Sequence, residues 1–199
     1  MQVNIFVNIY NIRLYNSYFR GINIACSLGM KTALLYPAYW IQKIRHLRLR
    51  IKYAVHPQSY FGAVKITGQK LRFGRGSYMN SGYISAGKAG VDVGAWCAIG
   101  YNVSIIAVTH DIHFPTGPEA LRPLNEKPVR IGDGVWIGNN VVILPGCTIG
   151  NYAVIGANSV VNRDIPDFAI CVGMPARVVK IKEQELCRQH ITFVEKNKE

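Results

Sequence analysis

Residues 131–166 read IGDGVW-IGNNVV-ILPGCT-IGNYAV-IGANSV-VNRDIP, which is six hexapeptides with no residue left over. Every hexapeptide begins with Ile or Val, four of the six have Gly second, and the fifth residue is always small or β-branched. A period of six matches neither the helical repeat of about 3.6 residues nor the simple alternation of a strand. It is typical of a chain that runs a short strand, turns and repeats, with three hexapeptides closing one triangular coil. The stretch therefore predicts a parallel β-helix.

In such a coil each aliphatic first residue points inward and stacks on its equivalents in the neighbouring coils. Small second and fifth residues let the backbone turn without collisions between side chains. We expect the second-position glycines to adopt the backbone dihedrals that these turns require, because Gly adopts them most easily.

The same spacing continues towards the N-terminus, where Val93, Ile99 and Ile105 are six residues apart. A second set of residues is also spaced by six, and its last member lies two residues before Val93. This set consists of Phe73, Met79, Ser85 and Val91. We therefore expect a β-helix domain over residues 61–181, with a first strand near Val64. An N-terminal cap region (1–60) precedes it, and a C-terminal tail (182–199) follows.

The period is interrupted once, between Ile105 and Ile131, whose separation is not a multiple of six. The segment between them contains four prolines. Proline cannot donate to a β-ladder, so residues 107–130 are expected to leave the coil as an extruded loop. A long loop on a rigid scaffold is where functional residues concentrate.

The cap region contains a segment, residues 36–53, in which apolar and basic residues are interspersed. Its apolar residues at helical spacing are Trp40, Ile41, Ile44, Leu47 and Ile51, and Lys or Arg fills five of the positions between them. One interpretation is a helix whose apolar face covers the open first coil. Another is a helix that lies on anionic lipid headgroups as a peripheral membrane contact. The period-two alternation of residues 47–53 also leaves a strand open.

Composition and net charge restrict the kinds of binding partner that this chain could have. The 199 residues are 49% apolar, which excludes a largely disordered chain, and the net charge of +12 favours an anionic partner. Nothing resembles an aromatic-rich platform for nucleic acid. The five cysteines have no CxxC spacing, and Cys97 and Cys147 occupy fifth positions of hexapeptides, so we interpret them as packing residues.

Neither a membrane-spanning segment nor a signal peptide is expected. The most apolar stretch, residues 22–41, is interrupted by Lys31 and Pro37. Together with the cysteine pattern, this predicts a cytoplasmic protein.

Three motifs resemble those of the hexapeptide-repeat acyltransferases, which fold as left-handed parallel β-helices. They are Thr109-His110, Gly134-Val-Trp136-Ile-Gly138 and the pair Asp164-Ile-Pro with Gly173-Met-Pro-Ala-Arg177. Within that family the chain is most similar to the sugar O-acetyltransferases of the galactoside and maltose type and to those that acetylate capsular or O-antigen sugars. The resemblance covers about residues 64–181. It implies a homotrimer with active sites between neighbouring β-helices and acetyl-CoA as the acyl donor.

The resemblance also assigns the reacting groups. His110 matches the family's catalytic His and would act as general base. Asn80 matches the Asn that binds the acceptor hydroxyl, although a turn Asn with positive φ is an alternative. Trp136 matches the Trp beside the thioester, and a trimer contact is compatible with that role. Asp111 would point away from its neighbour His110, so we interpret it as a residue that caps the loop.

The donor would be held along the later coils. By the same matching, the backbones of Asn139 and Ala157 would bind the pantetheine arm. The residues expected near the nucleotide end are Asn162, Arg163, Arg177 and Lys180. No metal is expected, since solenoid zinc sites draw three histidines from the coil faces and the repeats contain none.

The sequence therefore predicts an acetyl-CoA-dependent O-acetyltransferase that acetylates a sugar or glycan precursor by direct transfer. A xenobiotic or serine O-acetyltransferase and a non-catalytic binding solenoid are the alternatives. Residues 1–60 do not resemble the helical segment through which the galactoside and maltose enzymes contact their acceptors, so the acceptor sugar cannot be inferred from them.

Overall fold

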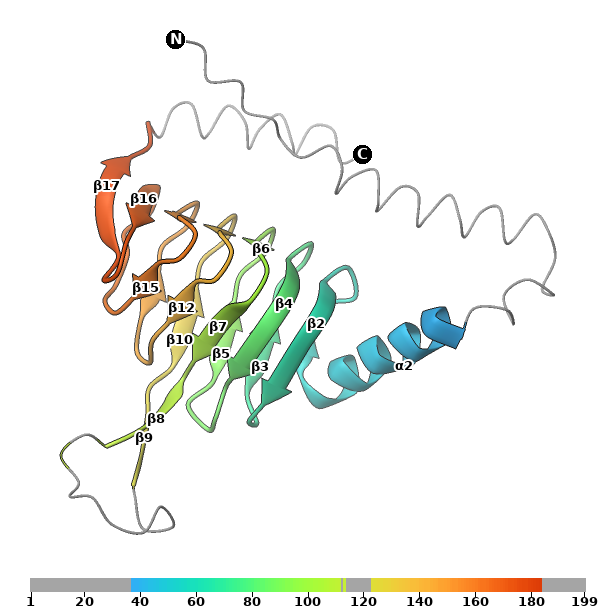
Figure 1. The fold of residues 1–199 in the computed structure, drawn as a ribbon. Coiled ribbons are helices and arrows are strands. Elements are labelled where there is room, and N and C mark those ends of the chain that lie inside the picture. Colours follow the sequence, from blue (N-terminus) through green and yellow to red (C-terminus); the bar gives the residue numbers. More distant parts are fainter. Residues whose placement is uncertain (1–36, 112, 114–122, 184–199) are drawn as a thin grey trace. The chain divides into compact units, whose positions relative to one another are not determined.

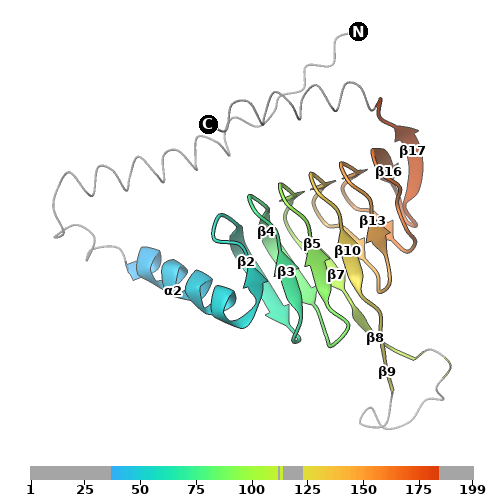
Figure 2. The same ribbon diagram turned by 180° about the vertical axis from the view of Figure 1, so that it is seen from behind.

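The computed structural model describes residues 37–111, 113 and 123–183 (Figure 1). After helix α2 (Pro37–Lys52) the chain winds into a solenoid of short parallel strands. The first of its three faces, seen in Figure 2, is a five-stranded sheet. Its strands are β1 (Ala54–Val55), β3 (Leu71–Phe73), β5 (Val91–Val93), β10 (Val129–Ile131) and β13 (Thr148–Ile149).

The other two faces share one ten-stranded sheet, because two long strands turn the corner between them. These strands are β2 (Tyr60–Thr67) and β4 (Tyr78–Ser85). The second face continues with β6 (Ala98–Ile99), β11 (Trp136–Ile137), β14 (Val154–Ile155) and β16 (Ala169–Val172). The third face continues with β7 (Val103–Ile106), β12 (Val142–Ile143) and β15 (Val160–Val161). β17 (Arg177–Ile181) runs antiparallel to β16. The predicted parallel β-helix is confirmed.

The core is a set of vertical stacks of first-position residues. Ile137 pairs in register with Ile99 on one side and Ile155 on the other, and all three are at most 1% exposed. Each buried aliphatic side chain contributes roughly 1.5–3 kcal/mol relative to an exposed one. The hexapeptide period is therefore the period of the core.

The second-position glycines have a different role from the one expected. None of them has positive φ; the left-handed residues of the repeats lie at the fourth position, as at Asn140 (φ 56°) and Gly146 (φ 84°). A Cβ on Gly138 would instead lie 2.6 Å from the backbone nitrogen of Ala157 in the next coil. Second-position glycine is thus required by the close approach of neighbouring coils, and the expectation about its dihedrals was wrong.

The solenoid begins earlier than the sequence suggested. β1 pairs with β3 through Ala54 and Val55, so the first coil starts directly after α2. Val55 and Phe61 lie on the six-residue grid of Phe73, but an aromatic residue at an inward position departs from the Ile/Val pattern. The rings of Phe61 and Phe73 are 4.4 Å apart, and the two large side chains fill this end of the core.

Residues 37–52 form a helix and not a strand, and two residues of its predicted apolar face, Leu47 and Ile51, do not pack on the coil. Leu47 and Ile51 are 56% and 78% exposed, whereas Leu49 packs against the core. The reason is local: Tyr53 is buried and its N–H bonds the carbonyl of Leu49, which turns the Leu49 side of the helix inward. In the described part of the chain no helix has the length and apolarity needed to cross a membrane.

Candidate active site

The break in the hexapeptide period corresponds to a hairpin that stands out from the solenoid (Figures 1 and 2). The chain leaves the coil after the buried Ala107 and forms β8 (Val108–His110), which pairs antiparallel with β9 (Leu124–Glu126). We call residues 108–126 the arm; residues 112 and 114–122 lie outside the described part. Two contacts hold its base: Lys127 N–H donates to Ala107 O (3.0 Å), and the Glu126 carboxylate accepts from the backbone at Lys88.

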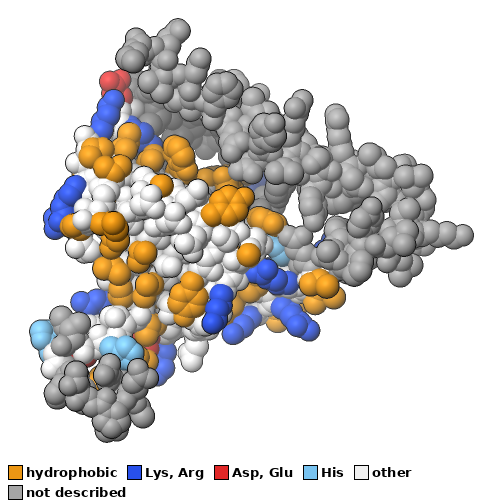
Figure 3. Space-filling view, in the orientation of Figure 1, with side chains coloured by type: hydrophobic (Ala, Val, Ile, Leu, Met, Phe, Trp, Pro, Cys, Tyr) orange, Lys and Arg blue, Asp and Glu red, His pale blue; other side chains and the backbone are white. Residues whose placement is uncertain are grey.

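His110 lies on the arm opposite Leu124, and its side chain is exposed. Among the described residues, no group hydrogen-bonds its imidazole. Figure 3 shows histidine side chains, in pale blue, on the surface of the arm. Asp111 accepts the N–H of His113 at 2.9 Å, so its carboxylate closes a turn, as expected, and does not orient His110. The described residues contain no group of three or more His, Cys, Asp or Glu side chains that could hold a metal.

Asn80 lies within strand β4, and its side chain is half-buried. It is absent from the residues with positive φ, so the interpretation as a turn Asn is excluded. Its carbonyl oxygen would lie 1.9 Å from a Cβ on Gly62 in the preceding coil, so Gly is required there. The backbone of Asn80 thus lies on a closely packed strand.

Trp136 begins β11 and is 60% exposed on the outer surface of the second face. Its neighbours in register are Ala98 and Val154, both much smaller than an indole. The side chain therefore stands above the surface around it, which is the outward orientation that the sequence predicted.

Asn139 and Ala157 lie on successive coils at the corner between the second and third faces. The carbonyl of Asn139 accepts the N–H of Asn158 at 2.9 Å, and its side chain accepts the N–H of Tyr101 at 2.8 Å. Both Asn139 and Ala157 are exposed. The corner is therefore rigid, and its backbone is accessible from outside.

This corner also carries an asparagine ladder that the sequence analysis missed. Asn102 donates to Asn140 and Asn140 to Asn158, each at 3.1 Å, and all three residues have positive φ. The signal was present as an Asn at the fourth position of three hexapeptides. The ladder keeps consecutive corners aligned along the edge where Asn139 and Ala157, the residues predicted to bind the acyl donor, lie.

The remaining candidates belong to the last coils. Asn162 and Arg163 follow β15, and Arg177 and Lys180 lie on β17; all four are exposed. Residues 173–176 run beside β15, because Val160 exchanges backbone hydrogen bonds with Gly173 and Ala176. In the described chain no hydrogen bond joins His110 to Asn80, Trp136 or any of the candidate donor residues.

A further polar group on the third face was not predicted. The hydroxyls of Tyr83 and Thr67 are 2.8 Å apart, and Lys65 lies 6.0 Å from the Tyr83 ring. Hydrogen bonds with Thr67 and then Ser85, helped by the charge of Lys65, lower the pKa of Tyr83. Tyr83 and Asn80 both belong to strand β4.

A family model described as "Bacterial transferase hexapeptide (six repeats)" matches residues 128–163. The galactoside O-acetyltransferase of Escherichia coli K12 is 36% identical over 129 residues, which cover 63% of this chain and 59% of that enzyme. The chain thus spans about six tenths of the length of this relative.

Two solved structures are similar over a larger share of their own chains. The hexapeptide-repeat acetyltransferase VCA0836 from Vibrio cholerae has 31% identity and a TM-score of 0.53, covering 66% of this chain and 72% of that one. A maltose O-acetyltransferase from Clostridium difficile 630 has 32% identity and a TM-score of 0.57, covering 70% and 75%. VCA0836 has also been solved in complex with acetyl coenzyme A.

Proposed function

Because the chain belongs to the hexapeptide-repeat acetyltransferases, we propose that it transfers an acetyl group from acetyl-CoA to a hydroxyl of a sugar or glycan precursor. The observation that carries this proposal is the exposed imidazole of His110 on an arm that leaves a rigid scaffold. The names of the relatives support it, since two of them are O-acetyltransferases acting on galactosides or maltose. The acetyl-CoA complex of VCA0836 supports the choice of donor.

The reaction needs a base, a thioester held close to the hydroxyl, and hydrogen-bond donors for the oxyanion. In this proposal His110 takes the proton of the acceptor hydroxyl as its oxygen attacks the thioester carbonyl carbon. The tetrahedral intermediate then expels the CoA thiolate, which receives that proton from the imidazolium. The amide of Asn80 holds the acceptor hydroxyl, since an amide can both donate and accept. The indole of Trp136 packs beside the thioester.

The donor would lie along the later coils. The exposed corner at Asn139 and Ala157 offers backbone groups to the two amides of the pantetheine arm. The phosphates would lie near the last coils, where the exposed side chains are Asn162, Arg163, Arg177 and Lys180. Three of these carry positive charge, which suits a polyanionic donor.

A homotrimer with shared sites belongs to the same proposal. The arm that carries His110 leaves the solenoid after the third face, whereas Trp136 lies on the second face and Arg177 on a strand beside that face. Residues spread over several faces and coils of a triangular solenoid converge most readily between two neighbouring copies. That spread supports a site to which each copy contributes a different part.

Acetyl-CoA is the probe that tests the function. Free acetyl-CoA at a hundredfold excess over its Kd should stabilise the protein by about 2.7 kcal/mol. Thioester cleavage should then depend on an added acceptor from a panel of mono- and disaccharides and of nucleotide- or lipid-linked sugars. Cleavage only with serine or aromatic xenobiotics would favour the alternative acetyltransferases. A protein that neither binds acetyl-CoA nor cleaves it would be a non-catalytic solenoid.

A further inference from the structure

Helix α2 presents two unlike faces. On one, Leu49 packs against the core and the His46 ring nitrogen lies 3.3 Å from the carbonyl of Phe61. On the other, Leu47 and Ile51 are 56% and 78% exposed. Successive residues of a helix are about 100° apart, so these two side chains form one stripe on the side opposite Leu49. The solenoid does not bury this stripe.

Cations border the stripe on both sides. By the same helical spacing Arg50 lies along one border, and Arg48 and Lys52 lie along the other. The helix contains no Asp or Glu. In Figure 3, Lys and Arg side chains lie beside exposed apolar side chains over this part of the molecule. An apolar stripe between two rows of cations is the pattern of a helix that lies in a membrane interface.

The positive charge of the whole chain is also concentrated in its N-terminal part, which contains α2. The first acidic residue is Asp92, and the 91 residues before it contain 13 of the 23 Lys and Arg. The rest of the chain has 10 basic and 11 acidic residues, so it is nearly neutral. The net charge of +12 therefore belongs entirely to the N-terminal part, which includes α2 and the first coils.

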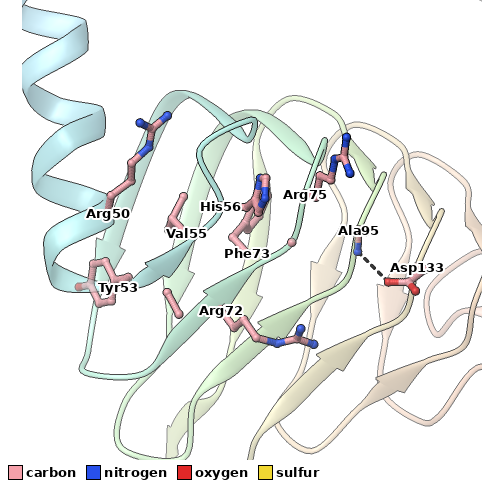
Figure 4. A pocket seen from close by; sticks show the side chains of 11 residues that line it. Arg50, Tyr53, Val55, His56, Arg72, Phe73, Arg75, Ala95 and Asp133 are labelled. Carbon is pink, nitrogen blue, oxygen red and sulfur yellow. Dashed lines mark hydrogen bonds between the residues drawn. The ribbon is translucent and has the colours of Figure 1, made fainter. Parts of the chain in front are cut away.

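A basic hollow continues this surface from α2 onto the first coils (Figure 4). It has a volume of about 560 Å³, and its lining includes Arg50, His56, Arg72 and Arg75. Arg72 is paired with Asp92 at 2.6 Å, and Arg75 donates to the side chain of Gln58 at 2.7 Å. Because guanidinium groups have five N–H donors each, these bonds leave donors for phosphate oxygens.

We propose that α2 docks this protein on an anionic membrane surface. The stripe of Leu47 and Ile51 enters the boundary between headgroups and acyl chains, and the bordering cations contact lipid phosphates. The docking needs neither the arm nor acetyl-CoA, so it is independent of the acyl transfer proposed above. It would place the solenoid where a lipid-linked acceptor is available.

Three other occupants fit the stripe less well. A second copy packing α2 against α2 would bring two sets of cations together with no acidic residue in either helix. Residues 1–36 are apolar enough, but they contain three cations and no acidic residue, so they offer no charge complement. A nucleic acid would match the cations and leave the apolar stripe in water. An anionic bilayer matches both.

Vesicle sedimentation of the full chain tests the proposal. Binding is expected to vesicles of equal parts phosphatidylcholine and phosphatidylglycerol, to be absent from pure phosphatidylcholine, and to be lost at about 0.5 M salt. The double variant Arg48→Gln/Lys52→Gln should bind roughly 30-fold more weakly, since each cation near the surface contributes about fivefold. The variant Leu47→Gln/Ile51→Gln should also lose binding while keeping its melting temperature, because both side chains are exposed.

The matched control removes the same charge elsewhere. Lys127→Gln/Arg130→Gln changes two exposed cations outside α2 and should bind like the wild type. Equal loss in this control would show that only net charge matters and would overturn the proposal. So would binding to neutral vesicles, no binding at low salt, or a change of oligomeric state in Leu47→Gln/Ile51→Gln without lipid, which would assign the stripe to a second copy.

Discussion

The carboxylate of Glu126 accepts the backbone N–H of Ala89 at 3.1 Å, across a separation of 37 residues. The same oxygen accepts the N–H of Lys88 at 2.5 Å. A Cβ on Gly87 would lie 2.6 Å from this oxygen, so the turn has room for the carboxylate only because it begins with Gly. The base of the arm that carries His110 is therefore fastened to a corner of the neighbouring coil.

Glu126→Gln should loosen the arm. Hydrogen bonds to a charged group contribute about 1.5–3 kcal/mol, and the neutral amide removes the charge that both backbone donors contact. Misplacing His110 should lower turnover roughly 10–100-fold without changing the Kd for acetyl-CoA. Steady-state kinetics gives the first quantity, and faster hydrogen exchange at Lys88 and Ala89 would report the opening directly.

Asp133→Asn is the control for this variant. Asp133 accepts the N–H of Ala95 at 2.7 Å, the same kind of bond at a corner that carries no arm. Both variants should lose stability, but only Glu126→Gln should lose turnover. Equal losses of turnover would mean that the effect comes from the solenoid as a whole and not from the arm.

His110→Ala should lower turnover by roughly 10²–10⁴-fold, the usual contribution of a positioned general base. Because the imidazole is exposed and no described residue hydrogen-bonds it, the melting temperature and the Kd for acetyl-CoA should not change. His113→Ala is the matched control, since His113 is exposed on the same arm, and it should keep wild-type turnover. Near wild-type turnover in His110→Ala would remove the base assignment.

The fold was predictable because the hexapeptide period is the period of burial. Ile99, Ile137 and Ile155 could be assigned to one stack from their first positions alone. The sequence did not show why Gly is required at each position, because a Gly that adopts a left-handed turn and a Gly that lets two coils approach closely look the same in the sequence. Only coordinates separate Gly138, which faces a backbone nitrogen, from Gly146, which has a positive φ.

The two kinds of glycine should respond differently to substitution. Gly138→Ala would place a Cβ 2.6 Å from the backbone of Ala157, so two coils must separate, and a loss of several kcal/mol is expected, as for overpacked cores. Gly146→Asn should cost less than about 1 kcal/mol, since Asn adopts positive φ readily and does so at Asn140. Urea unfolding compares the two, and equal losses would contradict the distinction.

The site was less predictable than the fold. The sequence predicts His110 as a site residue because the period breaks just before it, and Trp136 because an outward indole is unusual in the repeat; both also match the family motifs. It missed Glu126 and the asparagine ladder, since their hydrogen bonds join residues on different coils. The α2 helix was recognised, but its inward face is set by the buried Tyr53, and helical spacing alone favoured the larger apolar stripe.

Burial raises the pKa of Cys97 to about 11. A thiol whose pKa is raised on folding stabilises the protein below the pKa of the unfolded thiol, and that stability is lost as the pH rises towards 11. Between about pH 9 and 11 the free energy of unfolding should therefore fall by up to about 1.4 kcal/mol per pH unit from this group. Cys97→Ala should be less stable at pH 7 but show a shallower decline, measured by urea unfolding at each pH.

The final prediction concerns the assembly. If each site draws His110 from one copy and Arg177 from another, sedimentation should find a trimer at assay concentrations. Co-expressing His110→Ala with Arg177→Ala should then restore part of the turnover that each variant lacks alone. Restoration is expected because a mixed trimer contains some interfaces at which one copy supplies an intact His110 and its neighbour an intact Arg177.

The spread of these residues over the solenoid is the physical basis for that expectation. His110 lies on the arm, which leaves the solenoid after the third face, and Arg177 pairs with Val172 beside the second face. In the described chain no hydrogen bond joins His110 to the residues predicted to bind the acyl donor. The control is a double variant that carries both substitutions on one chain and is co-expressed with the wild type. Sites whose His110 and Arg177 both come from wild-type chains should then remain intact. An active monomer would contradict the shared site, and mixtures with no restored turnover would place both residues of a site on the same chain.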